Sequence, residues 1–165
     1  MVAAMALFSA GATRVGIVDL DMHYGDGTQD IIETLDIGDR VDHYTLGGVR
    51  RRRGGGESAL LRDLSEQLER MLPSTDIVLY QAGADSHIDD PLGGIFTTAG
   101  YRERDRLVFS AARRAGVPVA WNLAGGYQDP VSEVIALHRI TFEEAVRAES
   151  AGLLHAACEL RKGVV

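Results

Sequence analysis

Four short apolar stretches, each followed by small or polar residues, constrain the fold of this chain more than any other feature. They predict strands that end at Asp19 and that span residues 41–46, 77–80 and 117–122. Helical patterns separate these strands, and this alternation predicts an α/β fold with an open parallel sheet and helices on both faces. Because ligands bind at the carboxyl ends of strands in such sheets, the polar segments 19–23, 45–48, 83–85 and 125–127 are expected to share one site.

Helices are expected from the N-terminus to about Ala10 and over residues 28–35, 58–72, 98–115, 131–138 and 142–160. The helix at 58–72 has the clearest pattern, because its apolar residues recur at helical spacing before Pro73. These residues are Leu60, Leu61, Leu64, Leu68 and Met71. Residues 50–53, which are all arginine, and the three glycines at 54–56 instead predict a flexible basic loop.

The composition fits a single domain over residues 1–165, since 45% of the residues are hydrophobic. A formal net charge of −7 argues against direct binding of nucleic acid. The single cysteine, Cys158, excludes an internal disulfide and is expected to be a small core residue on a late helix. The Ala-rich first residues predict a helix rather than a signal peptide, and no apolar run is long enough to span a membrane. We therefore expect a cytoplasmic protein that binds no membrane.

The stretch from Asp19 to Gly27 holds the densest set of metal-binding and proton-handling groups. Side chains alternate along an extended chain, so Asp19, Asp21 and His23 can point the same way. Two carboxylates and an imidazole form a ligand set that suits a divalent metal. Two other interpretations of this stretch stay open. One is a loop whose acids face water, and the other is a magnesium-dependent phosphotransferase-like hydrolase with an aspartyl nucleophile.

Three motifs occur in order along the chain. They are Asp-Leu-Asp-Met-His-Tyr-Gly-Asp-Gly at 19–27, Gly-Ala-Asp at 83–85 with Asp-Pro-Leu-Gly at 90–93 behind it, and Gly-Gly-Tyr at 125–127. Together they resemble the zinc-dependent histone deacetylase family, including its bacterial histone deacetylase-like and acetylpolyamine amidohydrolase members. The resemblance implies an arginase/deacetylase-like fold that is incomplete at its N-terminus, so the chain would be the C-terminal portion of a deacetylase catalytic domain. It also implies a zinc-dependent deacetylase that removes the acetyl group of a small acetylated amine, such as an acetylpolyamine, or of acetyl-lysine in a protein.

Carried over by motif, the zinc ligands of the family fall on Asp21, His23 and Asp85. The same three residues also suit iron(II). Tyr127 matches the tyrosine that polarises the substrate carbonyl, and a phenol can stabilise the charge that develops on that oxygen. The glycines before it, Gly125 and Gly126, are expected at the substrate because they let the backbone approach closely.

Further roles follow from the same resemblance. Asp19 and Asp26 match the two acids that pair with a tandem histidine dyad in the family. Asp19 also matches a ligand of a structural potassium ion, together with Thr45 and Leu46. His87 matches a histidine that many bacterial members carry in this loop, so it is expected to contact the substrate.

The tandem histidine dyad itself is the main departure from the family pattern. In the family it lies upstream of the segment that begins at Asp19, where this sequence has only an apolar helix. Loss of general acid–base help lowers rates by about 10²–10⁴-fold, so the chain alone is expected to be weak or inactive. This leaves open whether it is an enzyme, a fragment that needs a complementing N-terminal chain, or a noncatalytic pseudoenzyme that binds a metal or a partner.

Three smaller expectations complete the interpretation. The arginines at 50–53 lie where the family carries aromatic residues of the acyl-lysine channel, and they form either a solvated charge run or a rim that attracts an acidic partner. The remaining histidines, His43, His138 and His155, are expected to be structural or solvent-facing. Absence of N-terminal strands would expose a sheet edge, so formation of homo-oligomers is expected.

Overall fold

The strand that carries the first motif lies inside the sheet. All five residues of β1 (Val15–Asp19) are buried, as expected for a parallel strand covered on both faces. β2 (Val41–Thr45) pairs with one side of it and β3 (Ile77–Gly83) with the other, so that Val15 lies opposite both Val41 and Ile77. β4 (Val119–Ala124) pairs with β3, which gives a parallel sheet of order β2-β1-β3-β4. In this computed structural model, the backbone of residues 1–53 and 55–162 and the side chains of residues 1–50 and 55–152 are described.

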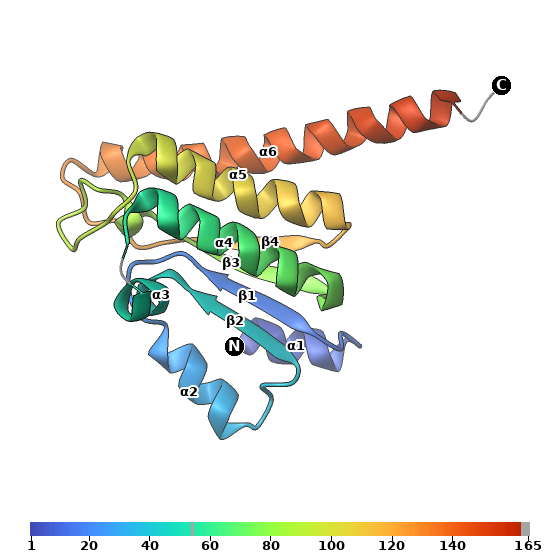
Figure 1. Ribbon diagram of the computed structural model, residues 1–165, viewed down its shortest axis with the longest axis horizontal. Helices are drawn as coiled ribbons and strands as arrows, with labels where there is room; N and C mark the ends of the chain where they lie inside the picture. The colour runs from blue at the N-terminus through green and yellow to red at the C-terminus, as the bar shows by residue number, and fades with distance from the viewer. Residues whose placement is uncertain (54, 163–165) are drawn as a thin grey trace.

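Helices cover both faces of the sheet, which confirms the predicted α/β architecture (Figure 1). One face carries α4 (Glu57–Met71), α5 (Thr98–Ala115) and α6 (Val131–Lys162), over a core that includes Val18 and Tyr80. The other face carries α1 (Val2–Ser9) and α2 (Asp26–Thr34), over a smaller cluster that includes Val15 and Ile17. Alternate residues of the same strands therefore feed two separate cores.

Most predicted elements are confirmed within a few residues. α5 has the predicted bounds, because the Thr97 hydroxyl caps its first turn and Gly116 ends it in the left-handed conformation with φ +71°. α4 ends as predicted before Pro73, which lies in the short 3-10 turn η1 (Leu72–Ser74). β3 extends three residues further than expected, to Gly83, and β4 begins two residues later, at Val119.

The prediction of a flexible loop over the arginines at 50–53 is wrong, because these residues are helical. β2 ends at Thr45, and α3 (Leu46–Arg53) is a helix that contains the first part of the predicted loop. Leu46 and Val49 are buried at helical spacing, so they anchor a segment whose glycines and arginines suggest a loop. Arg50 donates a hydrogen bond to the Gly93 carbonyl over 3.0 Å. Gly54 lies outside the described residues.

The two closing helices expected at 131–138 and 142–160 are in fact one. α6 continues without a break through Ile140 and Thr141, which are buried, and Thr141 lies against Tyr101 of α5. No glycine or proline lies at residues 139–141, between the two predicted helices, and the burial of Ile140 and Thr141 stabilises the continuous helix there. The predictions for Cys158 and His155 concern side chains outside the described residues.

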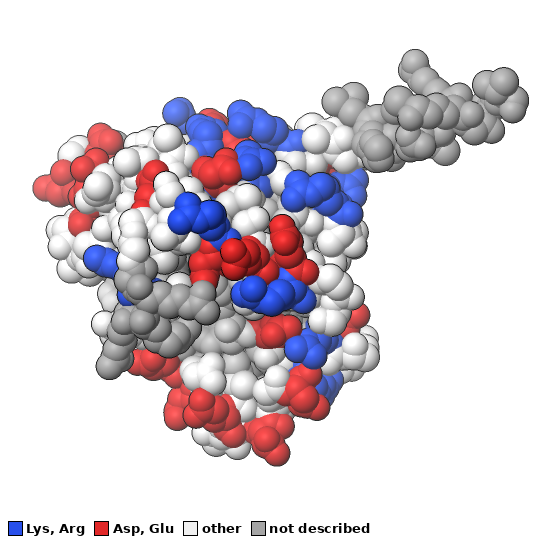
Figure 2. Space-filling model, in the orientation of Figure 1, with Lys and Arg blue, Asp and Glu red and all other residues white. Residues whose placement is uncertain are grey.

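The outer side of β4 is an open edge of the sheet among the described residues, where this strand pairs only with β3. Leu123, near the end of β4, is 54% exposed. In Figure 2, acidic and basic side chains are intermixed over α4, α5 and α6, whereas acidic ones prevail around α2. Among the described residues, no helix is both long enough and apolar enough to span a membrane.

Candidate metal centre

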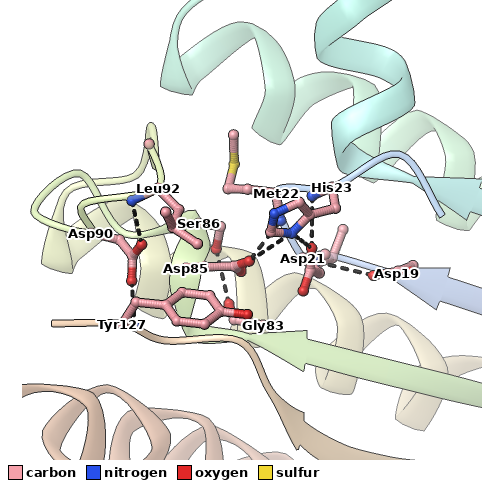
Figure 3. A network of polar contacts seen from close by, with 12 residues as sticks. Asp19, Asp21, Met22, His23, Gly83, Asp85, Ser86, Asp90, Leu92 and Tyr127 are labelled. Atoms are coloured by element: carbon pink, nitrogen blue, oxygen red, sulfur yellow. Dashed lines mark hydrogen bonds and ion pairs between the residues drawn. The ribbon is translucent and has the colours of Figure 1, made fainter. Parts of the chain in front are cut away.

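Two loops at the carboxyl end of the sheet bring two carboxylates and an imidazole together. Asp21 and His23 follow β1, and Asp85 lies in the 3-10 turn η2 (Ala84–Ser86) that follows β3. One potential ligand atom from each of the three residues lies within 4.8 Å of the others, and Figure 3 shows their side chains converging. The third member is Asp85 and not Asp19, although alternation along the chain allows Asp19 to point the same way.

His23 Nδ1 is the atom that both carboxylates approach. It lies 2.6 Å from Asp21 Oδ1 and 3.1 Å from Asp85 Oδ2. Backbone amides orient the two acids: the His23 N–H donates to Asp21 Oδ1 over 2.7 Å, and the Met22 N–H donates to Asp85 Oδ1 over 3.3 Å. Each acid is thus fixed by an amide of the β1 loop, with atoms turned toward a common centre.

These residues fit a divalent metal. Asp85 Oδ2 is buried and, among the described residues, has only the 3.1 Å ionic contact to His23 and no hydrogen bond. A buried carboxylate oxygen in this state is unfavourable unless a cation meets it. Zinc bonds to carboxylate oxygen and imidazole nitrogen are about 2.0–2.2 Å, so two atoms on one tetrahedral ion lie about 3.3 Å apart. The 3.1 Å between His23 Nδ1 and Asp85 Oδ2 is close to that value, whereas the 2.6 Å between His23 Nδ1 and Asp21 Oδ1 is the shorter distance of a direct hydrogen bond.

The charges of the group also favour an added cation. Burial, together with the charge of the neighbouring Asp21 carboxylate, raises the pKa of Asp85 to about 6. Burial likewise raises the pKa of Asp19 to about 6. The hydrogen bond to Asp21 raises the pKa of His23. Without a metal, protons would supply the positive charge that this cluster of acids requires.

Glycines allow the backbone to pack directly against the group. A Cβ atom added to Gly83 would lie 2.6 Å from Asp21 Cα, and one added to Gly125 would lie 2.5 Å from Asp85 Cγ. Gly125 and Gly126 have φ values of +55° and +99°, which favour glycine. The loop after β4 is therefore pressed against Asp85 as closely as the backbone permits.

Tyr127 follows these two glycines and is 53% exposed. In the view of Figure 3 its ring extends from the loop toward the side of the group formed by Asp85 and Asp21. The Tyr127 backbone N–H donates over 2.8 Å to Oδ2 of the buried Asp90, whose Oδ1 accepts from the Leu92 N–H over 2.9 Å. Asp90 thus ties two loops together, a role that sequence reasoning missed.

The residues assigned to potassium lie around the same turn as the metal group. Asp19 accepts a hydrogen bond from the Asp21 N–H over 3.1 Å, and it lies opposite Thr45 in the sheet. The Thr45 hydroxyl donates to the His23 carbonyl over 3.3 Å, and the buried Leu46 comes next. The potassium ion itself stays a prediction.

Asp26 lies apart from the group, exposed at the first position of α2. Among the residues whose side chains are described, no histidine forms a hydrogen bond with Asp26 or Asp19. The histidine pairing that the family resemblance associates with these two acids therefore has no counterpart among the described side chains.

His87 is buried, with both ring nitrogens engaged. Nδ1 accepts from the Asp89 backbone N–H over 3.3 Å and from the Gln128 side-chain amide over 3.2 Å. Nε2 therefore carries the proton and donates it to the Thr98 hydroxyl, 3.0 Å away. His87 connects its own loop to the residue next to Tyr127, and its predicted contact with substrate stays a prediction.

The sequence model of the histone deacetylase domain matches residues 48–141, more than half of the chain. The chain belongs to the histone deacetylase family. The matched region contains Asp85, Asp90 and Tyr127, whereas Asp21 and His23 precede it.

Similarity to individual proteins supports this family assignment. An uncharacterised protein of Picosynechococcus is 32% identical over 148 residues, which cover 81% of this chain and 49% of that protein. Acetylpolyamine amidohydrolase 1 of Pseudomonas aeruginosa is 30% identical over 155 residues, which cover 76% of this chain and 43% of the amidohydrolase. The solved HD domain of HDA15 aligns with a TM-score of 0.63 at 25% identity, over 89% of this chain and 48% of that one. These similarities confirm the predicted deacetylase-like fold. The chain spans about half the length, or slightly less, of each of these relatives.

Proposed function

We propose that this chain provides the metal-binding part of a deacetylase active site, which hydrolyses the amide bond of an acetylated amine. The observation that carries the proposal is the convergence of Asp21, His23 and Asp85 in a member of the histone deacetylase family. Relatives named acetylpolyamine amidohydrolase or histone deacetylase support an acetylpolyamine or acetyl-lysine as the substrate. On this proposal, residues 1–165 form the C-terminal portion of a catalytic domain.

Zinc is the metal that we propose for the group, and iron(II) is the alternative that the same ligands accept. Such an ion, when bound, supplies a Lewis acid for the amide carbonyl and lowers the pKa of a water molecule. The protein would hold it from the buried side with Asp85, which is fully buried, and with Asp21. The His23 side chain is 60% exposed, so the group opens to solvent on that side.

Tyr127 is proposed to act on the substrate directly. Its phenol would donate a hydrogen bond to the carbonyl oxygen as negative charge develops there. Asp90 would hold the backbone of Tyr127 in place through the 2.8 Å hydrogen bond. Removal of one such donor typically lowers the rate by about 10²–10³-fold, so Tyr127→Phe should slow deacetylation by an active assembly and leave its metal content unchanged.

Metal content tests the proposed site. Protein purified without chelator would be analysed for zinc and iron by mass spectrometry, as wild type, Asp21→Ala, Asp85→Ala and Asp89→Ala. Asp89 is the control, because its side chain is 79% exposed and lies outside the group. We expect near-stoichiometric metal in wild type and control, and its loss from the other two variants. A folded wild-type protein without transition metal would contradict the proposed site.

A noncatalytic metal-binding protein is the second candidate function. It is favoured by the lack of a histidine bonded to Asp19 or Asp26 among the described side chains. Addition of a segment that bears the tandem histidines, taken from a relative, separates the two candidates. A gain of deacetylase activity supports a complementing chain as partner, whereas metal binding without activity in the mixture supports the pseudoenzyme. Homo-oligomer formation and a cytoplasmic location stay predictions.

A further inference from the structure

Arg104 occupies an unusual position for an arginine. It lies in the middle of α5, and its side chain is fully buried beneath the two loops of the metal group. Its guanidinium stacks on the ring of Tyr101 at 3.8 Å and is paired with Asp105, which is also fully buried. Arginine is almost never buried completely unless it is paired, and replacement of a buried ion pair by apolar residues often leaves stability unchanged. The pair therefore calls for a reason other than stability.

The reason lies in what the guanidinium contacts. Arg104 Nη1 lies 2.7 Å from the Gly83 carbonyl oxygen, 2.6 Å from the Ser86 hydroxyl and 3.2 Å from the Leu20 carbonyl oxygen. Leu20 directly precedes Asp21, and Gly83 and Ser86 flank Asp85 on either side. One guanidinium nitrogen thus touches both segments that carry the acidic members of the metal group.

The contact fixes the peptide that leads into Asp21. The carbonyl of that peptide, on Leu20, accepts from Arg104, while its N–H, on Asp21, donates to Asp19 over 3.1 Å. With both ends bonded, the peptide plane cannot rotate without the loss of two hydrogen bonds. The η2 turn is held in the same way, since the Ser86 hydroxyl accepts from Arg104 and donates to the Gly83 carbonyl over 3.0 Å.

We propose that Arg104 is a positioning residue for the metal group. By binding the backbone of both loops from beneath, Arg104 sets the distance between Asp21 and Asp85. The inference rests on the proposed function, because it assigns Arg104 a role toward the metal that these residues would hold. Asp105 compensates the charge of the guanidinium and is itself bonded to the Tyr80 hydroxyl. Side chains that orient metal ligands from outside typically change metal affinity by about 10–100-fold when they are removed.

The test compares zinc affinity in three variants, measured by competition with a chromogenic chelator. Arg104→Met removes all the hydrogen bonds, and we expect zinc to bind about 10–100-fold more weakly. Arg104→Lys keeps the charge but cannot present the planar fork, so an intermediate loss is expected. Leu68→Ala is the control: Leu68 is a buried core residue of α4, so its truncation should lower thermal stability while every hydrogen bond of Arg104 is kept. Its zinc affinity should equal that of wild type.

Hydrogen exchange of the metal-free proteins gives an independent reading. The amides of residues 20–23 and 84–86 should exchange faster in Arg104→Lys than in Leu68→Ala. If Arg104→Met fails to fold, Arg104→Lys alone still tests whether Arg104 positions the two loops. Wild-type zinc affinity in the arginine variants, with exchange no faster than in the control, would overturn the inference and leave the proposed function intact. A wild-type protein that binds no zinc would overturn both.

Discussion

Gly125→Ala tests how tightly the loop after β4 is packed against Asp85. The added Cβ atom would lie 2.5 Å from Asp85 Cγ and 2.6 and 2.9 Å from its two oxygens. These separations are too short for a stable contact, so one partner must move. Asp85 is fully buried, and the Met22 N–H and His23 ring on its other side leave it little freedom to withdraw.

The expected loss has two parts. An alanine at the left-handed φ of +55° costs about 1–2 kcal/mol, and overpacking of a filled site costs about 1–3 kcal/mol more. The free energy of unfolding of the metal-free protein should therefore fall by roughly 2–5 kcal/mol. Displacement of the Asp85 carboxylate should also weaken zinc binding, by at least the tenfold that is typical when the surroundings of a ligand are disturbed.

Gly116→Ala separates these two parts. Gly116 has a similar φ of +71°, but no heavy atom lies within 4 Å of an added Cβ. This control should lose only the conformational part, about 1–2 kcal/mol, with unchanged zinc affinity. Urea unfolding of the metal-free proteins and zinc titration provide both quantities. If Gly125→Ala matched Gly116→Ala in both, the inferred close packing of the loop on Asp85 would be refuted.

Three further predictions concern pH, the Tyr127 loop and the sheet edge. Because burial raises the pKa of Asp85 from 3.8 to about 6, the folded metal-free protein binds more protons than the unfolded chain between these values. Its stability should thus fall as pH rises through this range, and urea unfolding at several pH values can check this. Zinc affinity should instead rise over the same range as protons leave the ligands, which zinc titration at these pH values can check. Asp90→Ala leaves two backbone N–H groups unpaired, and it should lower stability by about 1–3 kcal/mol and speed hydrogen exchange at Tyr127; unchanged exchange would contradict the role of Asp90. Leu123→Lys places a charge on the exposed edge of β4 and should reduce any self-association seen by size-exclusion chromatography; an unchanged elution volume of an oligomeric sample would exclude this edge as the interface.

Local sequence patterns were sufficient for most of the fold. α5 could be bounded correctly because its cap at Thr97 and its stop at Gly116 are local signals. α3 could not, because its helical state depends on the burial of Leu46 and Val49 beneath neighbouring elements. Tertiary contacts of this kind override the propensity of glycine-rich and arginine-rich segments.

The candidate site was predictable to a similar extent. Asp21 and His23 stand out as potential ligands from alternation alone, while Asp85 could be assigned only through its motif, since its partners lie on another strand. Arg104 gave one signal that could have been used, because it shares a helical face with the apolar residues Tyr101 and Val108. Its contacts with the β1 and β3 loops arise from tertiary structure, which no spacing along the chain reveals.

The hydrogen bond between Met22 and Asp85 joins residues that are 63 positions apart. The intervening chain includes β2, α3 and α4, so the ligand group cannot assemble until β1 and β3 have come together across a long loop. Contacts of such sequence separation form late, because loop closure is entropically costly. Capture of a metal ion would therefore report that β1 and β3 have paired, and zinc added to refolding protein should bind with the time course of this pairing and not with that of helix formation.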